Sequence, residues 1–92
     1  MNQKLSDKKL KESFKIIRLL CGPTRFKIVF LLKKNNKGLT VTEIAQLLNA
    51  SLSRISHQLR ILKKYKLVLA KKIDRKVIYT LKNHRIRKIL PF

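Results

Sequence analysis

Hydrophobic positions in the first third of the chain recur with a helical period. Apolar side chains at positions 10, 14, 17 and 20 alternate with lysines and predict an amphipathic helix over residues 5–20. Gly22 and Pro23 interrupt this pattern. A second helix is expected from Pro23 to about Lys34, because proline at the first helical position loses no hydrogen bond. The side chains expected to be buried in it are Phe26, Val29, Phe30 and Leu32.

A turn and a third helix follow. Gly38 ends a turn-rich stretch and can adopt a positive φ, and Leu39 is expected in a strand of one or two residues. Thr40 and Glu43 have the spacing of a capping box, which predicts that a helix begins there. The side chains that this helix is expected to bury are Ile44, Leu47 and Leu48.

A fourth helix is predicted directly after the third. Asn49 stands where a left-handed cap residue is needed, and Ser51 can cap the next helix. The apolar positions of that helix are Ile55, Leu59 and Leu62, spaced i, i+4 and i+7. Two short amphipathic helices joined by so tight a turn predict a helix-turn-helix.

The C-terminal third changes to a strand pattern. Leu67–Ile73 and Lys76–Leu81 are rich in β-forming residues, and Asp74 and Arg75 between them predict a hairpin. A last short helix is expected from about His84 to Leu90, before Pro91. The predicted fold class is mainly α with a small β-hairpin, a winged helix-turn-helix in which residues 1–92 form a single domain of about five helices and a two-stranded wing.

Charge narrows the choice of partner. The chain has 24 lysines and arginines against four acidic residues, and its net charge of +20 is spread along its whole length. Such a surface favours a polyanion, so nucleic acid is the leading partner and an anionic membrane surface the second. An AT-rich genome, which favours lysine, would also inflate this number.

The fourth predicted helix carries the candidate binding side chains. Short hydroxyl donors, forked guanidinium donors and amides on its outer faces suit base edges in a major groove. These residues are Ser53, Arg54, Ser56, His57, Gln58 and Arg60. For His57 the alternatives are groove contact and simple exposure, and for Arg60, Lys63 and Lys64 they are phosphate contact and a solvated helix face. The hairpin tip adds the cations Lys71, Lys72, Arg75 and Lys76.

Other classes of function find little support. The four acidic residues are Asp7, Glu12, Glu43 and Asp74, and none has a catalytic spacing with a histidine or hydroxyl, so no enzyme is expected. A single cysteine excludes an internal disulfide. No apolar stretch approaches the ~20 residues of a membrane span, and the start lacks a signal-peptide pattern, so a cytoplasmic location is expected.

Several segments, taken in order, resemble the ArsR-type winged helix-turn-helix repressors. They are Cys21-Gly22-Pro23-Thr24-Arg25 at a helix start, Ile55-Ser56-His57-Gln58-Leu59-Arg60-Ile61-Leu62-Lys63, Leu67-Val68, and Val77-Ile78-Tyr79-Thr80-Leu81. The resemblance covers about residues 10–90. It implies a homodimer that represses operons by binding palindromic double-stranded DNA operators.

The resemblance also assigns roles to residues. It implies a groove-facing recognition helix lined by Ser51, Ser53, Arg54, Ser56, His57 and Gln58, and a wing tipped by Arg75 and Lys76. In the family the first and last helices pair across the two-fold axis, which implies dimer contacts by Leu10, Phe14, Ile17, Ile86, Ile89 and Leu90. The wing departs from the family because its tip has no glycine, which predicts a longer turn or a type I turn around Asp74.

The sensor sites of the family are missing. Thr40 and Thr42 stand where many relatives hold a thiolate pair for soft metals, and hydroxyls cannot replace thiolates. Asn83 and Arg85 occupy two positions of a second, zinc-type site, and His84 between them would point elsewhere. No metal or cofactor is therefore expected. Cys21 is either a redox-sensitive thiol or, the preferred alternative, a small buried residue that fills the turn.

Two functional hypotheses follow. The first is a sequence-specific dimeric repressor without a metal switch. The alternative, motivated by the high charge, is a non-specific nucleic-acid-binding protein that coats DNA or associates with RNA. The operator sequence, the regulated genes, the strength of the dimer and any inducer are not encoded in recognisable motifs, nor is the choice between repression and activation.

Overall fold

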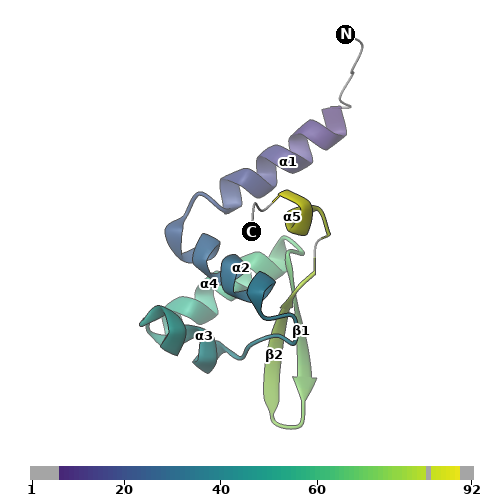
Figure 1. The fold of residues 1–92 in the computed structure, drawn as a ribbon. Coiled ribbons are helices and arrows are strands. Elements are labelled where there is room, and N and C mark those ends of the chain that lie inside the picture. The colour runs from purple at the N-terminus through teal and green to yellow at the C-terminus, as the bar shows by residue number, and fades with distance from the viewer. Residues whose placement is uncertain (1–6, 83, 90–92) are drawn as a thin grey trace.

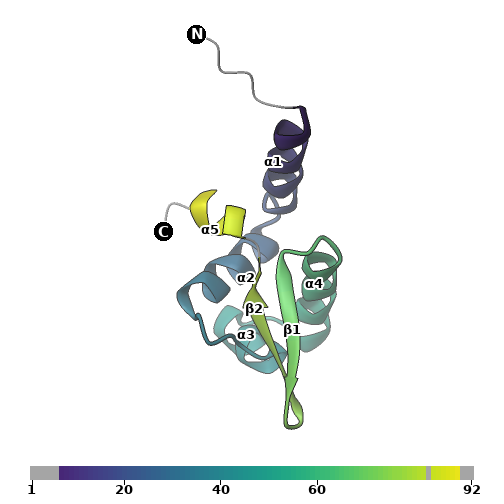
Figure 2. The same ribbon diagram turned by 90° about the vertical axis from the view of Figure 1, so that its right-hand side faces the viewer.

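The computed structural model describes residues 7–82 and 84–89 of the chain. Its elements are α1 (Asp7–Leu19), α2 (Pro23–Lys34), α3 (Val41–Leu48), α4 (Leu52–Lys64), β1 (Val68–Ile73), β2 (Lys76–Leu81) and α5 (His84–Ile89) (Figure 1). The predicted order of helices and hairpin is confirmed. Helices α2, α3 and α4 pack with the hairpin into one body, from which α1 projects at the end opposite the hairpin turn (Figures 1 and 2). This is a winged helix-turn-helix.

The hydrophobic core lies among α2, α3, α4 and the base of the hairpin. Its fully buried members include Ile28 and Leu32 of α2, Ile44 of α3, and all three apolar positions predicted for α4. Helix α5 closes one side with Ile86, and the Arg87 guanidinium donates to the Leu81 carbonyl and the Asn36 side chain. The three buried α4 residues hold that helix by one side only, which leaves its other faces open.

Two buried faces differ from the predictions. In α2, Ile28 is buried together with Val29 and Leu32, whereas Phe26 is exposed and Phe30 is half-buried. Positions 28–32 of α2 are all apolar, so periodicity alone does not select a face. In α3, Ala45 is buried, Leu48 is half-buried and Leu47 is 59% exposed. Ile44, Ala45 and Leu48 form the i, i+1, i+4 stripe, and Leu47 lies beside it.

Polar residues cap both ends of α3 and the start of α4. The Thr40 hydroxyl accepts from the Glu43 N–H at 3.1 Å and the Glu43 carboxylate accepts from the Thr40 N–H at 2.8 Å, which confirms the capping box. Asn49 adopts the predicted left-handed conformation with φ 52°. The Ser51 hydroxyl caps α4 by accepting from the Arg54 N–H at 3.2 Å. Thr40 and Glu43 thus fix the start of α3, and Asn49 and Ser51 fix the two ends of the turn between α3 and α4.

The Glu43 carboxylate makes the α3 cap sensitive to acid. The hydrogen bond from the Thr40 N–H, then the Thr40 hydroxyl and the charge of Lys76, hold the pKa of Glu43 below its usual value. A carboxyl with a lowered folded-state pKa stabilises the fold above its unfolded pKa, and this contribution is lost as pH falls through the folded pKa.

Thr40→Ala should therefore lower stability by about 0.5–2 kcal/mol at neutral pH, because it removes the N-cap acceptor. Glu43→Gln should reduce the loss of unfolding free energy as the pH falls below the usual carboxyl pKa. The reason is that glutamine can still accept the hydrogen bond but does not titrate. Urea unfolding at neutral and acid pH measures both. If the wild type and Glu43→Gln lost stability in parallel through that acid range, Glu43 would not be the group responsible.

The hairpin is joined to the helices through residues just before α3. Leu39 pairs with Tyr79 through N–H to carbonyl bonds of 3.0 and 2.8 Å, which confirms the predicted one-residue strand. Gly38 precedes it at φ 91°, as predicted. Leu39 therefore forms an isolated bridge at the side of the two-stranded wing.

The wing turn corrects one expectation. The strands stay paired up to Ile73 and Lys76, so Asp74 and Arg75 form a two-residue turn, and Asp74 lies at φ 57°. The turn is neither longer nor type I. Aspartate can replace glycine here because its short polar side chain tolerates the left-handed conformation.

Candidate nucleic-acid interface

The outer face of α4 is polar and basic. Ile55, Leu59 and Leu62 are fully buried. Apart from Leu52 at the helix start, the exposed side chains on the remaining faces are Ser53, Arg54, His57, Arg60, Lys63 and Lys64. No residue of α4 is acidic. A helix that is anchored on one side and carries short donors and cations on the others matches the shape and charge of a major groove.

Some polar side chains at the start of α4 form hydrogen bonds within the protein. The Ser51 hydroxyl accepts from the Arg54 N–H and lies 3.4 Å from the Ser53 hydroxyl. One guanidinium nitrogen of Arg54 donates to the Thr24 hydroxyl of α2 at 3.4 Å. Ser51 is thus engaged as a helix cap, whereas Ser53 and Arg54 remain exposed at the helix start.

Gln58 and Ser56 are half-buried on the flanks of α4. The Arg25 Nε of α2 donates to the Gln58 side-chain oxygen at 2.8 Å. Thr24 and Arg25 were not among the predicted binding residues, although both lie in the Cys21–Arg25 segment that carried the family resemblance. That segment was the signal that could have pointed to them.

The wing supplies a second basic surface. Lys71, Lys72, Arg75 and Lys76 are all exposed on the distal half of the hairpin, and Asp74 is the single acidic residue among them. The hairpin turn lies at the end of the molecule where α3 also lies (Figure 1). The geometry thus provides two separate basic elements, the outer face of α4 and the tip of the wing.

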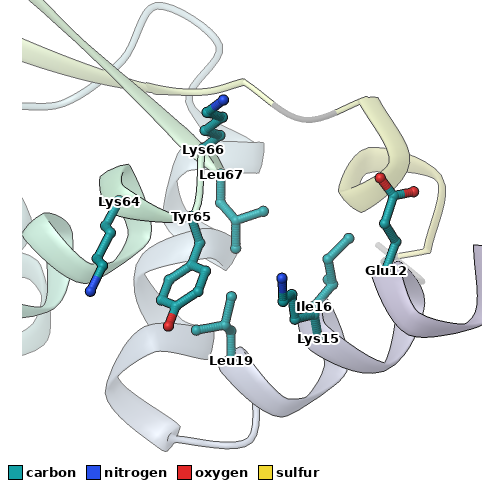
Figure 3. Close-up of a pocket in the computed structure, with 8 residues that line it drawn as sticks. All are labelled: Glu12, Lys15, Ile16, Leu19, Lys64, Tyr65, Lys66 and Leu67. Carbon is teal, nitrogen blue, oxygen red and sulfur yellow. The ribbon is translucent and has the colours of Figure 1, made fainter. Parts of the chain in front are cut away.

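Helix α1 has two different faces. Leu10, Phe14 and Ile17 form an exposed stripe, with exposed fractions of 49, 62 and 53%. The opposite face carries Ile16 and Leu19, which are buried against the body. Between that face and the end of α4 lies an open cleft, where Tyr65 and Leu19 point toward one another and Lys15 and Lys64 line the sides (Figure 3).

Residues 22–68, just over half of the chain, match the family model described as bacterial regulatory protein, arsR family. The chain belongs to the ArsR family. The matched segment runs from the residue before α2 to the first residue of β1, so it contains the whole helix-turn-helix. This confirms the resemblance inferred from the sequence.

Individual members of the family are similar over most of this chain. The HTH-type transcriptional regulator NmtR of Mycobacterium tuberculosis is 31% identical over 74 residues, which are 80% of this chain and 60% of NmtR. This chain therefore spans about 60% of the length of that relative.

Solved structures of ArsR-like proteins superimpose closely on this chain. HlyU from Vibrio cholerae has a TM-score of 0.84 at 25% identity and covers 91% of this chain and 89% of its own. The transcriptional repressor PagR of Bacillus anthracis has a TM-score of 0.80 at 26% identity and covers 91% of this chain and 94% of its own. Both relatives therefore match the complete winged helix and not the helix-turn-helix alone.

The dimer contacts expected for this ArsR-family chain need one correction. Ile86 is fully buried within the single subunit, so it belongs to the core and is not an exposed dimer contact. Helix α5 is only six residues long and uses Ile86 to pack on its own body. The side chain of Ile89 and all of Leu90 lie outside the described residues.

Thr40, Thr42, Asn83 and Arg85 are the residues that the resemblance placed at metal-binding positions of the family. The Thr40 hydroxyl is engaged in the α3 capping box and Thr42 is exposed. Asn83 and the side chains of His84 and Arg85 lie outside the described residues. Within residues 7–82 and 84–89, no three His, Cys, Asp or Glu side chains gather as a metal site would require.

Two remaining features bear on the sequence predictions. Cys21 is exposed at the corner between α1 and α2, which corrects the preferred expectation of a small buried residue. The corner is open because α1 projects from the body there. None of the helices in the described part of the chain has both the length and the apolar character needed to cross a bilayer.

Proposed function

We propose that this chain is a sequence-specific regulator of transcription that binds double-stranded DNA as a dimer and represses at a palindromic operator. The observation that carries the proposal is the outer face of α4, which is exposed, basic and free of acidic residues while its other side is fully buried. Membership of the ArsR family and the likeness to PagR, described as a repressor, support it.

In the proposed complex α4 enters the major groove. Ser53, Arg54 and His57 lie near its N-terminal half and contact base edges, whereas Arg60, Lys63 and Lys64 contact phosphates. The wing cations Lys72, Arg75 and Lys76 reach the neighbouring minor groove or its phosphates. The proposed activity is DNA binding with no catalytic step. The proposed location is the cytoplasm. No metal is part of the proposed mode of binding, and the engagement of the Thr40 hydroxyl in a helix cap is consistent with this.

Selection of bound sequences from a random duplex pool tests this proposal. An enriched inverted repeat, with half-sites about one helical turn apart, is expected for a dimer with two α4 helices in successive major grooves. Competition at moderate salt should then show that an arbitrary duplex displaces the selected one poorly.

The second candidate is non-specific nucleic-acid binding, which the net charge of +20 favours. It predicts no enriched sequence and equal competition by RNA or arbitrary DNA. That outcome would overturn the proposal of a sequence-specific regulator and leave the winged helix as a general cationic scaffold.

Arg54 and Lys63 should affect DNA binding differently. Arg54→Ala should cost about 1–3 kcal/mol on the selected site and little on random duplex, because a guanidinium contact to a base edge is sequence-dependent. Lys63→Ala should weaken binding to all sequences alike and reduce the steepness of the salt dependence. Binding titrations over a salt series measure both. If the two variants lost the same affinity on both duplexes, the proposed docking of α4 would be wrong.

The exposed stripe of α1 is the proposed dimer surface. Burying a phenylalanine side chain stabilises an interface by about 1.5–3 kcal/mol, so Phe14→Gln should raise the dimer dissociation constant at least about tenfold. Sedimentation velocity over a concentration series measures it. Leu47→Gln is the control, because Leu47 is about as exposed but lies on α3. If both variants dimerised like the wild type, the stripe would not be the interface.

A further inference from the structure

The hydrogen bond between Arg25 and Gln58 joins α2 to the flank of the recognition helix α4. The Arg25 Nε donates to the Gln58 side-chain oxygen at 2.8 Å, and both side chains are half-buried. A short bond from a cation to a carbonyl oxygen is among the stronger hydrogen bonds in proteins. It also settles how the amide is turned, because only the oxygen of Gln58 can accept from a guanidinium.

The Gln58 amide is therefore held by α2 through its oxygen. That oxygen accepts from Arg25, and the nitrogen carries two N–H donors that this contact does not use. A second contact acts on the same flank one helical turn earlier, where the Arg54 guanidinium donates to the hydroxyl of Thr24. Adjacent residues at the start of α2 thus orient polar side chains at positions 54 and 58 of α4.

We propose that Arg25 is a positioning residue that fixes the Gln58 amide so that its nitrogen donates to DNA. The proposal rests on the DNA-binding function proposed above. The partner of that nitrogen is a hydrogen-bond acceptor, either a phosphate oxygen or an acceptor on a purine edge. Paired to adenine, the amide would donate to N7 and accept from N6 with the second lone pair of its oxygen, since Arg25 uses only one.

The experiment is a double-mutant cycle on DNA affinity with the full chain. The variants are Arg25→Met, Gln58→Ala and both together, measured on the selected duplex and on random duplex. Arg25→Met should weaken binding by about tenfold, the size expected for losing a hydrogen bond to a charged group. In the Gln58→Ala background the same change should have almost no further effect, because Arg25 acts through Gln58.

Controls separate positioning from charge and from folding. Lys27→Met removes one positive charge from an exposed position of the same helix, and its loss should persist in the Gln58→Ala background. Arg25→Lys retains a cation that can donate to Gln58 and should restore part of the affinity. Thermal unfolding of each variant identifies any that has lost its fold.

The selected sequences show which acceptor Gln58 meets. If Gln58→Ala removes the preference for a purine at one position of each half-site, the partner is a base edge. If it lowers affinity equally on all duplexes, the partner is a phosphate. Additive losses in the cycle would overturn the proposal. If the wild type enriched no sequence, the proposed sequence-specific regulator would be wrong. The cycle measured on random duplex would still test whether Arg25 acts through Gln58.

Discussion

Replacing Leu59 with alanine should lower the free energy of unfolding by about 2–5 kcal/mol. Leu59 is fully buried at the middle of α4, between Ile55 and Leu62 on the same face. The truncation removes apolar contacts and leaves a cavity that a chain of this size closes only partly. Because small domains have a total stability of only about 5–15 kcal/mol, this single change threatens the fold of the whole DNA-binding unit.

Urea unfolding followed by circular dichroism measures this effect. Leu47→Ala is the matched control, since Leu47 is 59% exposed on the neighbouring helix α3 and its truncation should change stability by less than about 1 kcal/mol. Equal losses for the two variants would mean that α4 is not anchored through Leu59 in solution.

Gly38→Ala should be nearly as damaging, at more than about 2 kcal/mol, for a different reason. The backbone at Gly38 has φ 91°, a value that residues with a side chain rarely adopt. A Cβ there would lie 2.5 Å from the Ile78 methyl Cγ2 and 2.7 Å from the carbonyl oxygen of Tyr79. Backbone oxygen cannot move aside cheaply, so the wing and the Leu39 bridge would have to separate.

Gly22→Ala provides the comparison for Gly38→Ala. No atom lies within 4 Å of a Cβ built at Gly22, and its φ of −74° suits any residue. Because glycine is preferred to alanine at a helix N-cap, the change should cost about 1 kcal/mol, less than the change at Gly38. Thermal unfolding of both variants measures the difference. A Gly38→Ala protein as stable as Gly22→Ala would contradict the close packing of the wing on residue 38.

The helix ends were predictable because local chemistry sets them. Thr40 with Glu43 marks the start of α3, Asn49 its end and Ser51 the start of α4, and each acts within three or four residues of the chain. The buried side of α4 was predictable for a similar reason, since its apolar residues occupy one stripe among polar neighbours. These local signals were enough to place the helix-turn-helix and the candidate binding face.

Features that depend on distant parts of the chain were not predictable. Helix α2 is apolar on several sides, so only its neighbours decide that Ile28 is buried and Phe26 is exposed. Ile86 packs on its own subunit because Arg87 ties α5 to the end of β2. The contact of Arg25 with Gln58 joins residues 33 positions apart, and no sequence spacing announces it.

The adjacent residues Leu39 and Thr40 connect the wing to helices α3 and α4 as one rigid unit. Leu39 is paired to the hairpin at Tyr79, and Thr40 caps α3 immediately afterwards. No freely rotating residue separates the two attachments, so the angle between hairpin and α4 is set before any duplex arrives. Under the proposed mode of binding, a mismatch in groove width must then be absorbed by bending or twisting the DNA, and stiff sequences would be disfavoured at base pairs that no side chain touches.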